Sequence, residues 1–90
     1  MKTFNDLKFN LHPEKGFNTH AVMFFDNGYG ISVITGEHAY SDDENPYECA
    51  VIKRSEVGYC MVYDTPITDS VIGFCNKDKI TEIMKQIQQL

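Results

Sequence analysis

The sequence predicts an α+β domain: an antiparallel, hairpin-rich sheet of about five strands with one C-terminal amphipathic helix packed on one face. Three observations support this prediction. Apolar and polar residues alternate in several short segments, an Asn-Gly pair joins two of them, and the C-terminal segment has helical periodicity. Since no linker or internal repeat interrupts the 90 residues, we expect a single domain over residues 1–90.

The first strand is expected in the segment LKFNLHP. Leu7, Phe9 and Leu11 alternate there with polar residues, which is the period-two pattern of a strand with one apolar face. Pro13 and the loop after it are expected to end this strand.

The next two strands, THAVMFF and YGISVIT, lie on either side of Asn27 and Gly28. Asn-Gly favours a two-residue type I′ turn, because both central residues of that turn need a positive φ. Counting back from such a turn places four apolar residues on one face, in the pairs Phe24 with Ile31 and Val22 with Val33. We expect this face to pack against the helix.

The segments YECAVIKR and GYCMVYD predict a second hairpin, joined by SEVG. The segment TPITDSVIGF is open between a loop with a short helical turn and a crossing segment. A helix is expected from about Lys77, with Asn76 as its N-cap and Asp78 in its first turn. Its apolar stripe, at three- and four-residue spacing, comprises Ile80, Ile83, Met84, Ile87 and Leu90.

The net charge of −5 is unevenly distributed. No Lys or Arg occurs between Gly16 and Ile52, which disfavours direct nucleic-acid binding through this region. The carboxylates and tyrosines of the longest expected loop are the candidate partner-binding residues: Glu37, Tyr40, Asp42, Asp43, Glu44, Tyr47 and Glu48. They predict attraction of a partner protein with a basic surface, whereas a merely solvated loop is the alternative.

The sequence contains no pattern that favours catalysis or a cofactor. Cys49, Cys60 and Cys75 are too far apart for a CxxC motif, and their apolar neighbours are typical of buried thiols. The histidines and carboxylates lack the spacing of a metal site, so neither metal nor cofactor is expected. Without a signal peptide or a membrane-length apolar run, the chain is expected in the cytoplasm and away from membranes.

The segments FFDNGYGISVITG, YECAVI and YDTPITDSVIGF, followed by a short helix, resemble small, poorly characterised accessory proteins of tailed bacteriophages. The resemblance rests on the NGYG hairpin and the YDTPIT segment, and neither is a catalytic motif. It implies a viral origin, a host-cell location and a host protein as partner, with inhibition of that partner as one outcome. The alternatives are a self-associating homodimer and, less favoured, a small enzyme that uses Cys or His.

Overall fold

The computed structural model describes residues 1–11, 19–36 and 39–90, and it has the predicted α+β architecture. The elements, in chain order, are η1 (Phe4–Asp6), β1 (Asn10–Leu11), β2 (Thr19–Phe24), β3 (Tyr29–Ile34), β4 (Tyr47–Ser55), β5 (Gly58–Met61), β6 (Ile72–Cys75) and α1 (Lys77–Gln88). The first expected strand is shortened to β1, and the end expected for it at Pro13 lies outside the described residues.

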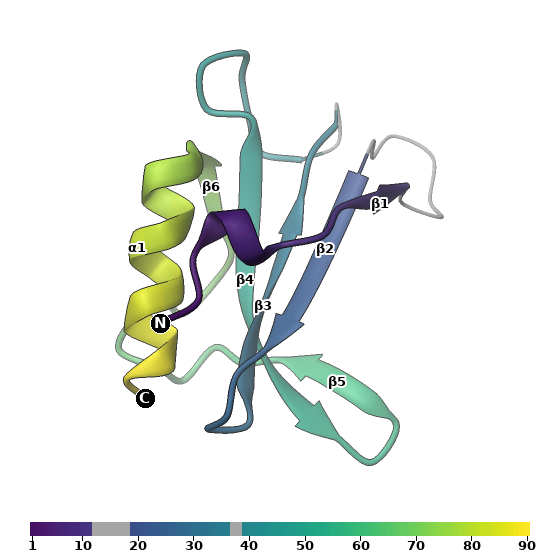
Figure 1. The fold of residues 1–90 in the computed structure, drawn as a ribbon, viewed down its shortest axis with the longest axis vertical. Coiled ribbons are helices and arrows are strands. Elements are labelled where there is room, and N and C mark those ends of the chain that lie inside the picture. Colours follow the sequence, from purple (N-terminus) through teal and green to yellow (C-terminus); the bar gives the residue numbers. More distant parts are fainter. Residues whose placement is uncertain (12–18, 37–38) are drawn as a thin grey trace.

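The strands form one antiparallel sheet in the order β1-β2-β3-β4-β5. β4 is long enough to have two partners on the same side: its first part pairs with β6 and its last part with β5. The sheet curls, α1 covers one of its faces, and the β4–β5 hairpin projects away from the helix (Figure 1). β6 belongs to the segment whose structure the sequence left open.

The turn between β2 and β3 differs from the predicted type I′ turn. Gly28 has a φ of 87°, but Asn27 is not among the residues with positive φ. The Gly28 N–H donates to the Phe25 carbonyl at 3.1 Å, and the Phe25 N–H donates to the Tyr29 carbonyl at 2.8 Å. These bonds define a three-residue loop, a type I turn in which Gly28 forms the bulge. The prediction of a two-residue type I′ turn was therefore wrong.

The extra loop residue shifts the register of the hairpin by one. Phe24 lies opposite Gly30 and Met23 opposite Ile31, so the predicted pairs Phe24–Ile31 and Val22–Val33 were wrong. A shift of one residue moves the side chains of one strand to the other face of the sheet. The face of this segment that turns towards the core therefore carries Ala21, Met23 and Phe25, in place of Val22 and Phe24, and Met23 and Phe25 pack with the core cluster of α1 and the sheet.

The side chain of Asn27 explains why this turn is preferred. Its amide nitrogen donates to the carbonyls of Ile87, at 2.9 Å, and Leu90, at 3.3 Å. Its oxygen accepts the N–H of Tyr29 at 3.1 Å. Asn27 thus bonds carbonyls at the end of the helix, where the Ile87 carbonyl also accepts the Leu90 N–H at 3.1 Å.

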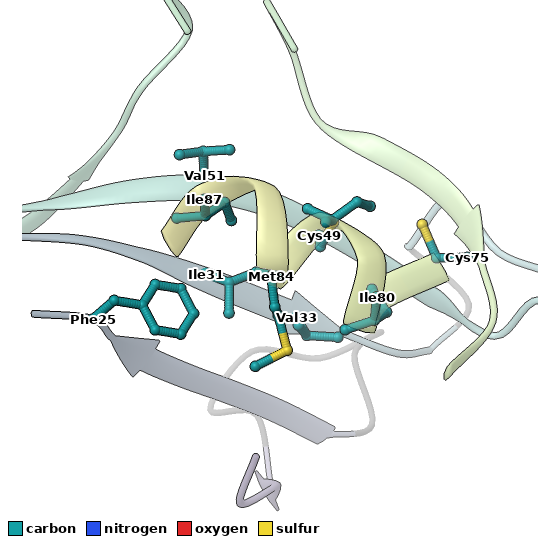
Figure 2. Packing of buried hydrophobic residues seen from close by; sticks show 10 residues of the cluster. Phe25, Ile31, Val33, Cys49, Val51, Cys75, Ile80, Met84 and Ile87 are labelled. Carbon is teal, nitrogen blue, oxygen red and sulfur yellow. The ribbon is translucent and has the colours of Figure 1, made fainter. Parts of the chain in front are cut away.

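The helix begins and packs as predicted. The Asn76 side chain accepts the N–H of Lys79 at 2.8 Å, which confirms the N-cap. Ile80, Ile83, Met84 and Ile87 are at most 2% exposed and belong to the buried core. Figure 2 shows Ile80, Met84 and Ile87 of the helix packed against the sheet. The sheet contributes Phe25, Ile31, Val33, Cys49, Val51 and Cys75 to this core. Leu90 follows the end of α1 and is 37% exposed, so it is not part of the buried stripe.

The opposite face of the sheet is apolar at one end. Ile52 is fully buried there, on the face of the sheet opposite α1. The ring of Phe24 lies over Gly30, where an added Cβ would be 3.0 Å from Phe24 Cδ1 and 3.2 Å from Ile52 Cγ1. Tyr59 contacts Phe24 at a ring separation of 5.8 Å, and the Arg54 guanidinium stacks 4.1 Å from the same ring. The absence of a side chain at Gly30 is what allows this packing.

Candidate functional site at the acidic end

The acidic loop, defined here as Asp42, Asp43 and Glu44, lies between β3 and β4. It is found at the end of the molecule where β4 and α1 both begin (Figure 1). An open hollow of about 400 Å³ separates Asp43 and Glu44 from the first residues of the helix, which include Lys77 and Asp78. The Lys77 ammonium group lies 5.6 Å from the centre of the Phe4 ring. Carboxylates from two elements, Asp43 and Glu44 on one and Asp78 on the other, therefore border one exposed depression.

Asp42 stabilises the loop itself. Its carboxylate accepts the N–H of Asn45 at 2.7 Å and that of Glu44 at 3.1 Å. Its own N–H donates to the Asn45 carbonyl at 3.1 Å. An aspartate that bonds the backbone two and three residues ahead closes a turn. Asp42 therefore fixes the positions of its neighbours Asp43 and Glu44, which are both exposed.

A second group of contacts joins the start of this loop to the sheet. The Tyr40 N–H donates to the Glu48 carboxylate at 2.8 Å, and the Phe74 N–H donates to the Tyr40 carbonyl at 2.7 Å. A Cβ on Gly73 would lie 2.6 Å from the Cβ of Tyr40, so only glycine permits this approach. Glu48 and Gly73 thus hold Tyr40 beside β6.

Two aromatic side chains are exposed as a result. Tyr40 is 64% exposed and Phe74 is 57% exposed. Phe74 also has a φ of 53°, a left-handed conformation that residues other than Gly, Asn and Asp rarely adopt. No pattern in the sequence indicates Phe74 as a site residue. Its position depends on the pairing of β6 with β4, and the sequence did not predict that strand.

The other predicted site residues differ in their surroundings. Tyr47 packs against Phe4 and Phe9 at ring separations of 5.1 Å and 5.8 Å and is half-buried. Glu48 is half-buried and bonded to the backbone, as described above. Glu37 lies outside the described residues. The structure thus separates exposed carboxylates, at Asp43 and Glu44, from carboxylates that hold the loop, at Asp42 and Glu48.

The cysteines have different environments. Cys49 and Cys75 are buried in the core on neighbouring strands, whereas Cys60 is exposed on β5. The neighbouring Cys75 thiol, together with burial, raises the pKa of the Cys49 thiol well above its usual range, and the same pairing lowers the pKa of the Cys75 thiol. Cys49 is therefore protonated at neutral pH, which is unsuitable for a nucleophile. In the part of the chain that the structure describes, no three His, Cys, Asp or Glu side chains are grouped as metal ligands.

This raised pKa predicts a loss of stability at alkaline pH. Above the ordinary thiol pKa of 9.0, the unfolded chain releases the Cys49 proton while the folded chain retains it. The free energy of unfolding should then fall with rising pH by about 1.4 kcal/mol per unit from this group alone. Below pH 9 the thiol is protonated in both states, so this group should cause no loss of stability there. Urea unfolding between pH 8 and 10.5 measures the slope.

The variant Cys49→Ala/Cys75→Ala provides the control for that measurement, because the two thiols titrate as a pair. It should be less stable at every pH because it leaves a cavity, but its alkaline slope should be shallower than that of the wild type. Equal slopes in the two proteins would contradict the assigned cause.

Comparison of the chain with protein-family models, with curated proteins and with solved structures gave no match. No residue role is therefore transferred from another protein. No helix among the described residues has the length and apolar character needed to cross a bilayer.

Proposed function

We propose that this chain is a non-catalytic binding protein whose acidic end engages a basic surface on another protein. The observation that carries the proposal is the display of Asp43 and Glu44 on a loop held by its own hydrogen bonds. The same segment carries the exposed Tyr40, whose carbonyl accepts the N–H of the exposed Phe74. Binding residues are commonly presented on loops that a rigid scaffold positions. The half-buried Tyr47 and Glu48 would then stabilise the segment that carries the interface.

The charges and the rings have different parts in this proposal. Exposed carboxylates raise the encounter rate with a basic surface and add less to the affinity of the final complex. Large aromatic side chains supply apolar contact area at low entropic cost. Asp43 and Glu44 would steer the partner, and Tyr40 and Phe74 would retain it.

The partner class that fits is a protein whose basic surface ordinarily contacts phosphate groups, since clustered carboxylates can occupy the same cationic sites. Together with the resemblance to bacteriophage accessory proteins, this chemistry points to a bacterial host protein in the cytoplasm. The chain would bind that protein and inhibit it. A polyanion such as heparin should then compete with this protein for the partner.

Differential capture from a bacterial lysate tests the proposal. Three baits are compared: the wild type, Asp43→Asn/Glu44→Gln, and Asp69→Asn/Glu82→Gln. The third bait removes the same charge at exposed positions outside the acidic loop. Quantitative mass spectrometry should find a protein with a basic surface on the first and third baits and depleted on the second.

Asp42 and Glu48 are left unchanged in these baits because their substitution would alter the loop as well as its charge. A Tyr40→Ala bait tests the aromatic part: it should capture less of the same protein. The proposal is contradicted if every protein captured by the wild type is captured equally by Asp43→Asn/Glu44→Gln.

A further inference from the structure

The outer edge of β5 is an exposed strand edge in the described part of the chain. β5 ends the strand order, and all four of its residues are exposed. Natural edge strands are usually protected by charged side chains or proline. The segment Gly58–Tyr63 contains neither, in a protein with a net charge of −5. The hairpin that carries β5 also projects from the body of the sheet (Figure 1).

The hydrogen-bonding pattern shows which backbone groups face outward. The Val62 N–H donates to the Val51 carbonyl at 2.9 Å, and Cys60 lies opposite Lys53. In an antiparallel pair, hydrogen-bonded positions alternate with non-bonded ones. The backbone groups of Cys60 and Val62 therefore point towards β4, whereas those of Tyr59 and Met61 point away from it, towards the free edge.

The side chains on this strand are apolar and exposed. Tyr59 is 42% exposed and Met61 is 48% exposed, and both lie on the face opposite the helix. Tyr63 continues the alternation, is 50% exposed and donates its hydroxyl to the Met61 sulfur at 2.9 Å. Val57, at the hairpin tip, is 96% exposed.

We propose that β5 pairs antiparallel with β5 of a second copy, about a two-fold axis at Cys60, to form a homodimer with a continuous sheet. In this register Tyr59 of each copy lies opposite Met61 of the other. The outward N–H and C=O groups of both residues are then satisfied, and an aromatic side chain meets a thioether in each pair. The strand is thus complementary to itself, as an isologous interface requires, and no charged side chain of either strand is brought to the contact.

The register makes a specific geometric prediction. Because the backbone groups of Cys60 point towards β4, Cys60 and its counterpart form a non-hydrogen-bonded pair, with Cα atoms about 4.5 Å apart. This separation lies within the range that a disulfide spans. A mild oxidant should therefore link two copies through Cys60, each thiol losing one proton and one electron to the oxidant. Cys49 and Cys75 are buried and should not react.

Two measurements on the purified full chain test the proposal. Sedimentation equilibrium in reducing buffer, over a micromolar concentration series, should give the mass of a dimer. Met61→Pro removes an outward N–H that no bond within the chain uses, and should raise the dimer Kd about tenfold or more. Leu11→Pro places proline in the opposite edge strand, at a residue that is 86% exposed, and should leave the Kd unchanged.

Copper–phenanthroline oxidation, read on a non-reducing gel, tests the register. The wild type should give a linked dimer, and both Cys60→Ser and Met61→Pro should give little. Far-ultraviolet circular dichroism establishes that each variant is folded. A wild type that is monomeric at every concentration would overturn the proposal. The β5 edge would then be open to pairing with a strand of another protein. A dimer unaffected by Met61→Pro, or one not linked through Cys60, would also overturn it.

Discussion

Replacing Ile83 with alanine is expected to lower the free energy of unfolding by about 2–5 kcal/mol, a large share of the total for a domain of this size. Ile83 is 2% exposed and lies in the middle of the stripe that α1 packs against β3 and β4. Truncation removes buried methyl groups and leaves a cavity, because the strands on the other side of the core cannot move into the space.

Urea denaturation followed by circular dichroism measures this effect as a shift in the midpoint. Gln86→Ala is the matched control: it places alanine in the same helix at an exposed position, where it should change stability by no more than about 0.5 kcal/mol. An Ile83→Ala midpoint equal to that of the wild type would mean that the helix stripe is not the core.

Gly30→Val is expected to destabilise the protein by about 1–3 kcal/mol or more, although valine usually favours a strand. A Cβ at this position would clash with the backbone carbonyl of Met23, and it would also displace the Phe24 ring and Ile52. Of these neighbours, the carbonyl is the least able to move, because it belongs to the adjacent paired strand.

Thermal unfolding of Gly30→Val, beside Ser55→Val on the exposed part of β4, measures that cost. Ser55→Val should melt within a few degrees of the wild type, whereas Gly30→Val should melt well below it. If the two variants melted together, the packing of Phe24 over Gly30 would be wrong.

The helix was predictable because its determinants are local. Asn76 caps the first turn through a residue three positions away, and the stripe from Ile80 to Ile87 follows from helical periodicity alone. The second hairpin was predictable for the same reason, since its strands are joined by a short turn.

The features that the sequence did not predict depend on distant partners. Asn27 is a favourable residue for a type I′ turn, but here its side chain bonds carbonyls at the end of the helix. These bonds favour the three-residue turn and the shifted register of the hairpin. β6 pairs with β4, which is more than twenty positions earlier in the chain, so TPITDSVIGF carries no local hairpin signal. The sequence placed five carboxylates together without distinguishing Asp42 and Glu48, which bond backbone N–H groups, from Asp43 and Glu44.

The salt dependence of the association rate tests the proposed function most directly. The captured protein is immobilised, and surface plasmon resonance measures kon for the wild type, Asp43→Asn/Glu44→Gln and Asp69→Asn/Glu82→Gln over a series of salt concentrations. We expect kon to fall steeply with salt for the wild type and for the Asp69/Glu82 variant, and to be lower and less dependent on salt for the Asp43/Glu44 variant. Equal slopes for the Asp43/Glu44 variant and the wild type would contradict a binding role for the acidic loop.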